Sequence, residues 1–362
     1  MSKDSHKHIQ KSETSSVNTN SKAIDRFKKL QQKEVVVDAI FNDIVKGKSA
    51  ALSKGITLIE STKKKDIVKA QQLLEMCLPH ANNSVRIGIT GVPGVGKSTF
   101  IEALGKLGLK KGKKIAILAI DPSSSLSNGS ILGDKTRMES LVQSSKVFIR
   151  PSPSGKSLGG VAQKTRESII LCEAAGYDTI LIETVGVGQS ETAVHSMVDF
   201  FLLLKLAGAG DELQGIKRGI IEMADAIVIN KADKDNVLNA RKAKNQFAKA
   251  LHLYPIAQNE WSPKVLTCSA IEEIGIEAIW DMITSYVKLT TENGFFEKNR
   301  IEQNSSWLLQ TIDEQLKKSF YTNAKIKKEL PIKLEAVRQH KTTPFAAANY
   351  LLKILKKDTT DL

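Results

Sequence analysis

A glycine-rich stretch that ends in lysine and serine is the part of this sequence whose residue types and spacing most clearly suggest chemistry. It reads Gly-Val-Pro-Gly-Val-Gly-Lys-Ser over residues 91–98. Because glycines let successive backbone N–H groups turn inward around a phosphate chain, this spacing is typical of a phosphate-binding loop. Lys97 adds a cation, and Ser98 adds a hydroxyl that can bind Mg²⁺. We expect nucleotide contacts along the whole loop, from Gly91, Val92, Pro93, Gly94, Val95, Gly96, Lys97, Ser98 and Thr99.

Three acidic residues are candidates for holding the magnesium ion that accompanies nucleotide phosphates. Asp121 directly follows the apolar run 114–120, and Asp134 lies in the Gly/Ser-rich loop after it. Glu183 directly follows a later apolar run, 179–182. Because Mg²⁺ prefers carboxylate and water oxygens, we predict that these residues and Ser98 bind it directly or through water. For Asp121 and Asp134 the alternative is an aspartate that caps a turn or a helix.

The stretch after Glu183 bears on how fast a nucleotide would be hydrolysed. Gly186 can place its backbone N–H against the γ-phosphate. In many small GTPases a glutamine directly after this glycine orients the attacking water, but here that position is Val187. We therefore expect slow hydrolysis by the chain alone, unless Gln189 or a partner supplies the group, although Gln189 is equally explained as a polar residue ahead of a helix. The catalytic candidates are Lys97, Asp121, Glu183 and Gln189.

A second motif selects the base. Asn230-Lys-Ala-Asp233 directly follows the apolar run 225–229. The Asp233 carboxylate can accept from both N1–H and the exocyclic amine of guanine, which adenine does not present in that arrangement, while the stem of Lys231 packs along the base. After a later apolar run, Ser269 and Ala270 offer a backbone N–H to the guanine oxygen, unless they form an ordinary turn. The sequence thus predicts GTP and GDP as ligands.

These motifs need a sheet whose strand ends meet at one edge. Apolar runs alternate with amphipathic helices from residue 85 to about 290, which predicts an α/β fold with a mostly parallel sheet flanked by helices, of the P-loop NTPase type. In such sheets ligands bind at the carboxyl ends of the strands. The expected strands are 85–90, 114–120, 146–149, 179–183, 198–204, 225–229 and 264–268.

Helical patterns flank this core on both sides. We predict a disordered polar tail over 1–23, a helical N-terminal extension over 24–84, a GTPase core over 85–290 and a C-terminal helical arm over 291–362. The arm carries two long apolar patterns, at about 297–323 and 331–357. Because helices outside a complete core usually pack on it or join subunits, we favour a dimerisation arm and a homodimer. The loops at 154–160 and 207–215 are either partner contacts or plain connections.

Composition restricts the class of protein. The chain has 362 residues, 41% of them hydrophobic and 25% charged, which is ordinary for a globular protein. Its net charge of +14 is spread along the helical flanks without interleaved aromatics, so we expect a lysine-rich surface and no nucleic-acid partner. No apolar run is long enough for a membrane span, and the polar N-terminus lacks the features of a presequence. Three widely spaced cysteines predict free, buried thiols and a cytoplasmic location.

Taken together, the quoted stretches resemble the MeaB/ArgK-type GTPases that accompany methylmalonyl-CoA mutase. The resemblance rests on the loop from Gly91 to Thr99, the Asp121-Pro-Ser-Ser loop with Gly129–Met138, the stretch from Glu183 to Glu191, and the motif at 230–233. It implies a homodimeric G protein that gates adenosylcobalamin delivery to the mutase, or to a related acyl-CoA mutase, and protects or reactivates it. It also implies metal roles for Ser98, Asp121, Asp134 and Glu183, phosphate contact by Lys97, and base recognition by Asn230, Lys231 and Asp233.

Two alternatives remain open at this stage. A nickel-insertion GTPase usually needs a His-rich or Cys-rich metal store, and only His6 and His8 suggest one here. A kinase linked to amino-acid transport needs a protein acceptor site and a general base near the γ-phosphate, and the sequence shows no dedicated base.

Overall fold

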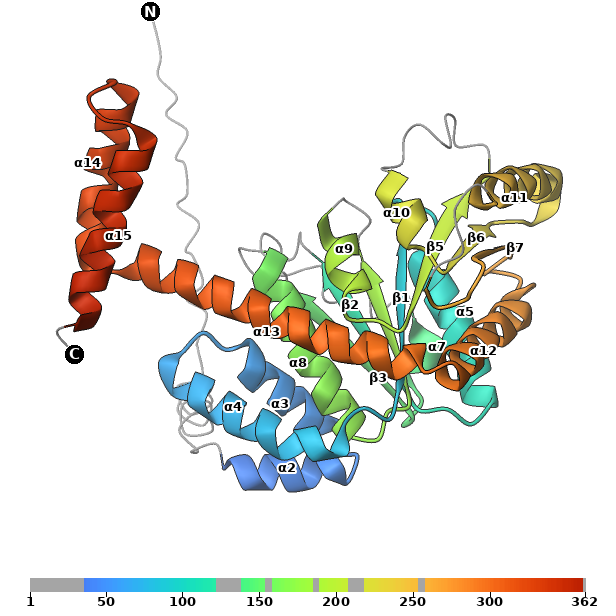
Figure 1. The fold of residues 1–362 in the computed structure, drawn as a ribbon. Helices are drawn as coiled ribbons and strands as arrows, with labels where there is room; N and C mark the ends of the chain where they lie inside the picture. Colours follow the sequence, from blue (N-terminus) through green and yellow to red (C-terminus); the bar gives the residue numbers. More distant parts are fainter. Residues whose placement is uncertain are drawn as a thin grey trace, which may run out of the picture.

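A seven-stranded sheet in which every neighbouring pair is parallel forms the centre of the molecule (Figure 1). The computed structural model describes residues 36–121, 138–153, 158–184, 189–207, 218–252 and 258–360. The strand order is β3-β2-β4-β1-β5-β6-β7. All seven expected strands are present, which confirms the predicted α/β fold: β1 (Val85–Gly91), β2 (Ile115–Asp121), β3 (Val147–Pro153), β4 (Thr179–Thr184), β5 (Phe200–Leu206), β6 (Ala226–Asn230) and β7 (Lys264–Thr267).

Helices cover both faces of the sheet, which is why its strands are apolar along their whole length. In β5, Phe200 and Leu202 pack into the core on one face, whereas Phe201 and Leu203 pack on the other, because side chains alternate along a strand. The first face is covered by α5 (Lys97–Lys110), α7 (Glu139–Val142) and α12 (Ile276–Glu292). The second face is covered by α8 (Leu158–Ala174), α9 (Gln189–His195), α10 (Arg218–Met223) and α11 (Val237–Leu251).

The N-terminal helices form an outer layer over α8 (Figure 1). They are α2 (Val37–Val45), α3 (Ser49–Glu60) and α4 (Lys64–Cys77), followed by a short 3₁₀ turn at Leu78–His80. Leu52, Ile56 and Ile59 of α3 are fully buried and join the same core cluster as Leu171 of α8. The helical extension is therefore present from residue 37 onward. The tail over 1–23 and the segment 24–35 lie outside the described residues.

The C-terminal segment differs from the sequence-based expectation. Three helices occur there: α13 (Phe295–Thr322), α14 (Ala324–Arg338) and α15 (Pro344–Thr360). The long apolar pattern expected at about 331–357 is divided between two helices, because His340 takes a left-handed φ of 55° and the Thr343 hydroxyl caps a new helix by accepting from Ala346 N at 3.2 Å. Pro344 suits the first helical position, since it has no N–H to satisfy. In Figure 1, α13 crosses the molecule and carries α14 and α15 as a pair away from the sheet.

Buried ion pairs fix the start of α13 to the amino ends of the strands. The Arg300 guanidinium donates to both carboxylate oxygens of Asp199, at 2.7 and 2.8 Å, and to Ser84 O at 2.6 Å. Arg86 pairs with Glu173 at 2.9 Å and donates its backbone N–H to Asp199 at 2.8 Å. Burial opposes the ionisation of Glu173, but Arg86 holds its pKa below the usual value. All four side chains are buried, so this end of the arm is tied to the core.

Two sequence-based expectations concern the cysteines and the membrane. Cys77, Cys172 and Cys268 are free and buried, as expected. Burial raises the pKa of the Cys77 thiol to about 11 and that of Cys268 to about 12, which keeps both protonated. No helix among the described residues is long and apolar enough to cross a membrane.

Candidate functional site

The phosphate loop joins the end of β1 to the start of α5, as its spacing predicted. Lys97 is the first residue of α5, and its Nζ turns back over the loop to donate to Gly91 O at 2.8 Å and to Val92 O at 3.4 Å. Burial lowers the pKa of Lys97, and the nearby carboxylates of Glu183 and Glu191 oppose that shift. The lysine ammonium thus lies inside the loop, beside the helix N-terminus at which phosphate anions bind.

Two glycines of the loop occupy positions where a side chain would collide with neighbouring strands. Gly96 has a φ of 92°, and a Cβ there would lie 2.9 Å from Asn230 Nδ2. Gly91 has a φ of 154°, and its Cβ would lie 2.6 Å from Leu204 O. Both glycines allow the loop to approach the carboxyl ends of β5 and β6, where the base-binding motif begins.

A hydroxyl and a carboxylate meet beside the loop, where a divalent cation would bind. Ser98 Oγ donates to Glu183 Oε1 at 3.3 Å, and Glu183 comes from β4, the strand next to β1. Hard oxygen donors of this kind fit Mg²⁺, which takes few protein ligands when phosphates and water complete its shell. In the described part of the chain, no three His, Cys, Asp or Glu side chains gather into a metal-binding group. Ser98 and Glu183 would help to hold such a cation, which would supply positive charge beside the nucleotide phosphates.

The remaining predicted ligands of that cation are only partly described. Asp121 is the last residue of β2, the strand on the other side of β4, so its backbone ends at the same edge of the sheet. Asp134 and Gly186 lie outside the described residues, as does Val187. Gln189 is the first residue of α9, which agrees with a position at a helix start. The roles of these residues stay predictions.

At the other end of the site, two loops hold the carboxylate that would bind the base. Ser269 is completely buried, and its hydroxyl donates to Asp233 Oδ2 at 2.6 Å while accepting from Glu272 N at 3.2 Å. Ala232 N donates to Cys268 O at 2.9 Å, which joins the loop after β6 to the loop after β7. The Ser269 side chain thus holds the Asp233 carboxylate, and the predicted contact of Ser269 with the nucleotide stays a prediction.

Asn230 connects the base loop to the phosphate loop. Its buried amide donates from Nδ2 to Val95 O at 2.9 Å, and its Oδ1 accepts from Ala270 N at 3.2 Å. Lys231 has a left-handed φ of 58°, and its Nζ donates to Gly94 O at 2.9 Å. Strained backbone of this kind is often found at binding sites. The two halves of the site are therefore held in one fixed relation.

Two features of the site escaped the sequence analysis. Glu191 is buried in the first turn of α9 and acts electrostatically on Lys97. Its only signal in the sequence is an acidic residue near a helix start, which is common on surfaces too. Thr184 Oγ1 donates to Thr90 Oγ1 at 2.8 Å, and this buried bond joins the ends of β4 and β1 just below the loop.

Comparisons with known proteins agree with this geometry. The family model described as "Methylmalonyl Co-A mutase-associated GTPase MeaB" matches residues 52–325. The GTPase ArgK of Escherichia coli (strain K12) is 44% identical over 315 residues, covering 87% of this chain and 95% of that protein. A Mus musculus protein named methylmalonic aciduria type A homolog, mitochondrial, is 43% identical over 330 residues, covering 88% of this chain and 80% of that protein. A crystal structure titled LAO/AO transport system kinase superposes with a TM-score of 0.72 at 37% identity, covering 89% of this chain and all of that one.

Proposed function

Because the chain belongs to the MeaB family of methylmalonyl-CoA mutase-associated GTPases, we propose that it is a G-protein chaperone of that mutase or of a related acyl-CoA mutase. It hydrolyses GTP to GDP and phosphate and uses Mg²⁺. In the proposed role, the nucleotide state gates the loading of adenosylcobalamin into the mutase, and the protein protects or reactivates that enzyme. The family match over residues 52–325 carries the proposal, because it includes both the nucleotide site and the whole of α13.

The residues of the site divide the work of binding and hydrolysis. Asp233, oriented by Ser269, selects guanine, and Asn230 keeps that carboxylate at a fixed distance from the phosphate loop. Lys97 is already charged and desolvated beside the loop carbonyls, so exchanging those carbonyls for phosphate oxygens strengthens its electrostatic interaction. Ser98 and Glu183, which lie within hydrogen-bond distance of each other, would hold Mg²⁺ together with Asp121 and Asp134. Positioning and charge stabilisation of this kind account for most of phosphoryl-transfer catalysis.

Hydrolysis by the chain alone is proposed to be slow. Val187 stands where small GTPases have the glutamine that orients water, and an aliphatic side chain offers no hydrogen bond for that purpose. Gln189, at the start of α9, is the nearest candidate in the chain. The partner enzyme is expected to supply or position the missing group, which would make turnover depend on the complex.

The C-terminal arm is proposed to join two copies of the chain. Leu309, Ile312 and Leu316 lie at i, i+3 and i+7 on α13, with exposed fractions of 64%, 45% and 61%. This spacing makes one apolar stripe along the helix, and such stripes are normally covered by another helix. The boundaries of the extension at 24–84, the core at 85–290 and the arm at 291–362 stay proposals. We also place the protein in the cytoplasm, in keeping with its three free thiols.

Transfer of adenosylcobalamin to the apo-mutase tests the proposed role. The absorption spectrum of the cofactor reports loading into a complex of mutase and this protein with GTP, GDP or a non-hydrolysable GTP analogue. We expect loading to proceed with GTP and to be blocked with the analogue. An Asp233→Asn variant serves as the control, because its amide fits the C2 oxygen of xanthine, and so it should respond to XTP instead. Loading at the same rate with every nucleotide would contradict a gating role.

A further inference from the structure

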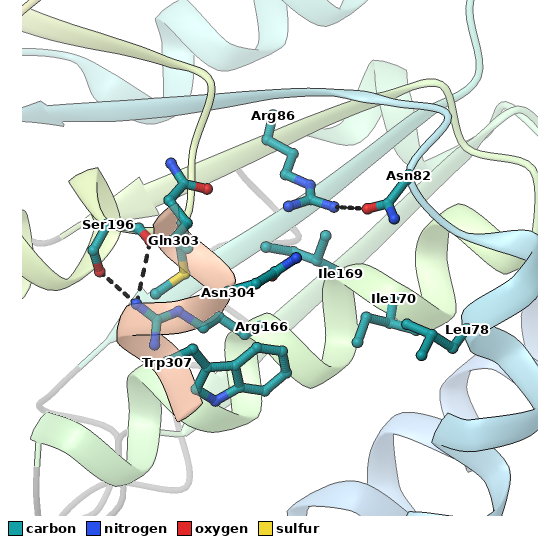
Figure 2. Close-up of a pocket in the computed structure, with 11 residues that line it drawn as sticks. Leu78, Asn82, Arg86, Arg166, Ile169, Ile170, Ser196, Gln303, Asn304 and Trp307 are labelled. Carbon is teal, nitrogen blue, oxygen red and sulfur yellow. Dashed lines mark hydrogen bonds between the residues drawn. The ribbon is translucent and has the colours of Figure 1, made fainter. Parts of the chain in front are cut away.

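A cavity of about 260 Å³ lies between α8 of the core and α13 of the arm (Figure 2). Its walls come from α8, from the residues just after α9, from α13 and from the segment that leads into β1. Arg86, the second residue of β1, marks its position at the amino end of the sheet, whereas the nucleotide site lies at the carboxyl end. None of the described residues assigned above to nucleotide or Mg²⁺ binding lines this cavity.

Arg166 of α8 is a buried cation in the wall of this cavity. Its side chain is 7% exposed as a residue, and its hydrogen bonds go to neutral acceptors: Ser196 Oγ at 2.6 Å, Ser196 O at 3.2 Å and Gln310 Oε1 at 3.2 Å. Among the described residues, Arg166 forms no ion pair with a carboxylate. Burial lowers the pKa of Arg166, and the more distant Glu314 opposes the shift. A buried charge without an ionic partner is unfavourable, so the site favours an anion.

The other arginine of the cavity is already neutralised. Arg86 pairs with Glu173 at 2.9 Å and donates to Asn82 Oδ1 at 3.0 Å, as Figure 2 shows for the second contact. Arg86 therefore has a carboxylate partner among the described residues and Arg166 has none, so the positive charge without an ion pair lies at the Arg166 side of the cavity.

Two polar atoms on α13, from residues that line the cavity, lack hydrogen-bond partners. Trp307 Nε1 and Gln303 Oε1 are both shielded from solvent and have no hydrogen bond. The orientation of the Gln303 amide is set by its Nε2, which donates to Val198 O at 2.8 Å. The Arg166 guanidinium lies 5.7 Å from the centre of the Trp307 ring, and Figure 2 shows it between that ring and Ser196. Unsatisfied buried groups of this kind usually indicate an absent ligand or water.

The rest of the wall is apolar, and its size limits the occupant. Leu78, Ile169, Ile170 and Met197 supply this part of the lining. Pockets for drug-sized ligands have volumes of about 300–1,000 Å³, so a cavity of about 260 Å³ suits a smaller ligand. A water molecule can satisfy Gln303 or Trp307, but it does not neutralise Arg166, and it gains nothing from the apolar wall.

We propose that this cavity binds a small carboxylate with a short aliphatic chain. The carboxylate accepts hydrogen bonds from the Arg166 guanidinium and from Trp307 Nε1, and the chain packs against the apolar residues of α8 and Met197. Gln303 Oε1 then accepts from a water or from a hydroxyl of the ligand. This site is separate from the GTP site, and the inference does not depend on the proposed function.

Ligand-observed NMR on the full chain, with hexanoate as the probe, tests the proposal. We expect saturable binding with a dissociation constant of about 1 mM or lower, a value in keeping with eight non-hydrogen atoms. Arg166→Gln should weaken hexanoate binding about tenfold or more, because a hydrogen bond to a charged group is lost. Trp307→Phe removes the N–H donor and replaces the indole by a single smaller aromatic ring, so it should weaken binding about threefold or more. Arg338→Gln, an exposed arginine on α14, is the matched control and should bind hexanoate as the unaltered chain does.

Two further probes distinguish recognition of the carboxylate from packing of the aliphatic chain. Hexanol lacks the anion, and inorganic phosphate lacks the chain, so each should bind at least about tenfold more weakly than hexanoate. Circular dichroism of both cavity variants establishes that they are folded. The proposal is overturned if hexanoate does not saturate, if Trp307→Phe and Arg166→Gln both bind it unchanged, or if hexanol or phosphate binds as tightly.

Discussion

Removal of the Ser269 hydroxyl tests whether this side chain orients Asp233 for guanine recognition or only stabilises the fold. Ser269 is completely buried, and its bond to Asp233 measures 2.6 Å. A hydrogen bond to a charged group contributes about 1.5–3 kcal/mol, so Ser269→Ala should lower the free energy of unfolding by roughly this amount. The same substitution leaves the Asp233 carboxylate free to rotate, and this freedom should lower the affinity for guanine nucleotides.

The effect on affinity is smaller than the effect on stability, because the hydrogen bond exists both with and without nucleotide. Binding then has to immobilise one side chain, at a cost of about 0.5–1.5 kcal/mol. The dissociation constant for GDP should therefore rise about threefold to tenfold. Titration of a fluorescent GDP analogue measures this change, and urea unfolding measures the change in stability.

A double-mutant cycle identifies the path of the effect. If Ser269 acts through Asp233, then Ser269→Ala should change GDP affinity very little in a chain that already carries Asp233→Ala. Thr311→Ala, whose hydroxyl bonds only to Trp307 O within α13, is the control for loss of a hydroxyl group. Equal losses of affinity in both backgrounds, or an unchanged affinity in the single variant, would refute the orienting role.

Three further predictions follow from the packing of the fold and the arm. Arg300→Met leaves the Asp199 carboxylate buried without its partner and should lower the free energy of unfolding, measured in urea, by about 3–5 kcal/mol. Lys298→Met, on the exposed side of α13, is the control and should change this free energy little. Equal effects of the two substitutions would contradict a stabilising role for the Arg300–Asp199 pair. Burial raises the pKa of Asp225 from 3.8 to about 7, although the Phe201 N–H and Tyr286 oppose the shift, so the folded state holds this proton more tightly than the unfolded chain. The stability that this proton contributes is complete below about pH 4 and is lost as the pH rises to about 7, by about 4 kcal/mol in all. Asp225→Asn should remove this part of the pH dependence of the free energy of unfolding in urea. An unchanged pH profile would contradict the prediction. Leu309→Glu together with Leu316→Glu should convert the proposed dimer to a monomer in sedimentation velocity, and a chain that is monomeric before substitution would exclude the arm as a dimer contact.

The sequence predicted those parts of the structure that depend on local spacing. The seven strands were recognisable as short apolar runs, because a sheet covered on both faces needs apolar side chains on both. The phosphate loop was recognisable because Gly91, Gly96 and Lys97 must stand at fixed offsets for backbone N–H groups to surround a phosphate. The break between α14 and α15 was missed, although Thr343 and Pro344 signal a helix start, because the apolar spacing continues across it.

Contacts between distant segments were beyond the reach of sequence patterns. Asn230 binds the phosphate loop across 135 positions, and Arg300 reaches Asp199 across 101. The cavity at the base of the arm draws its lining from four separate segments, so no single stretch carries its signature. Such contacts depend on how the layers of the fold pack against one another. Many different local sequences are compatible with the same packing, so a local pattern does not identify the contacts.

GTP turnover by the purified chain, alone and with stoichiometric methylmalonyl-CoA mutase, tests the central claim most directly. We expect a slow basal rate, because Val187 cannot orient water, and a clear rise when the mutase is added. The rise should require the intact base site and disappear in Asp233→Asn assayed with GTP. A rate that is the same with and without the mutase would contradict the proposed partnership while leaving the GTPase activity in place.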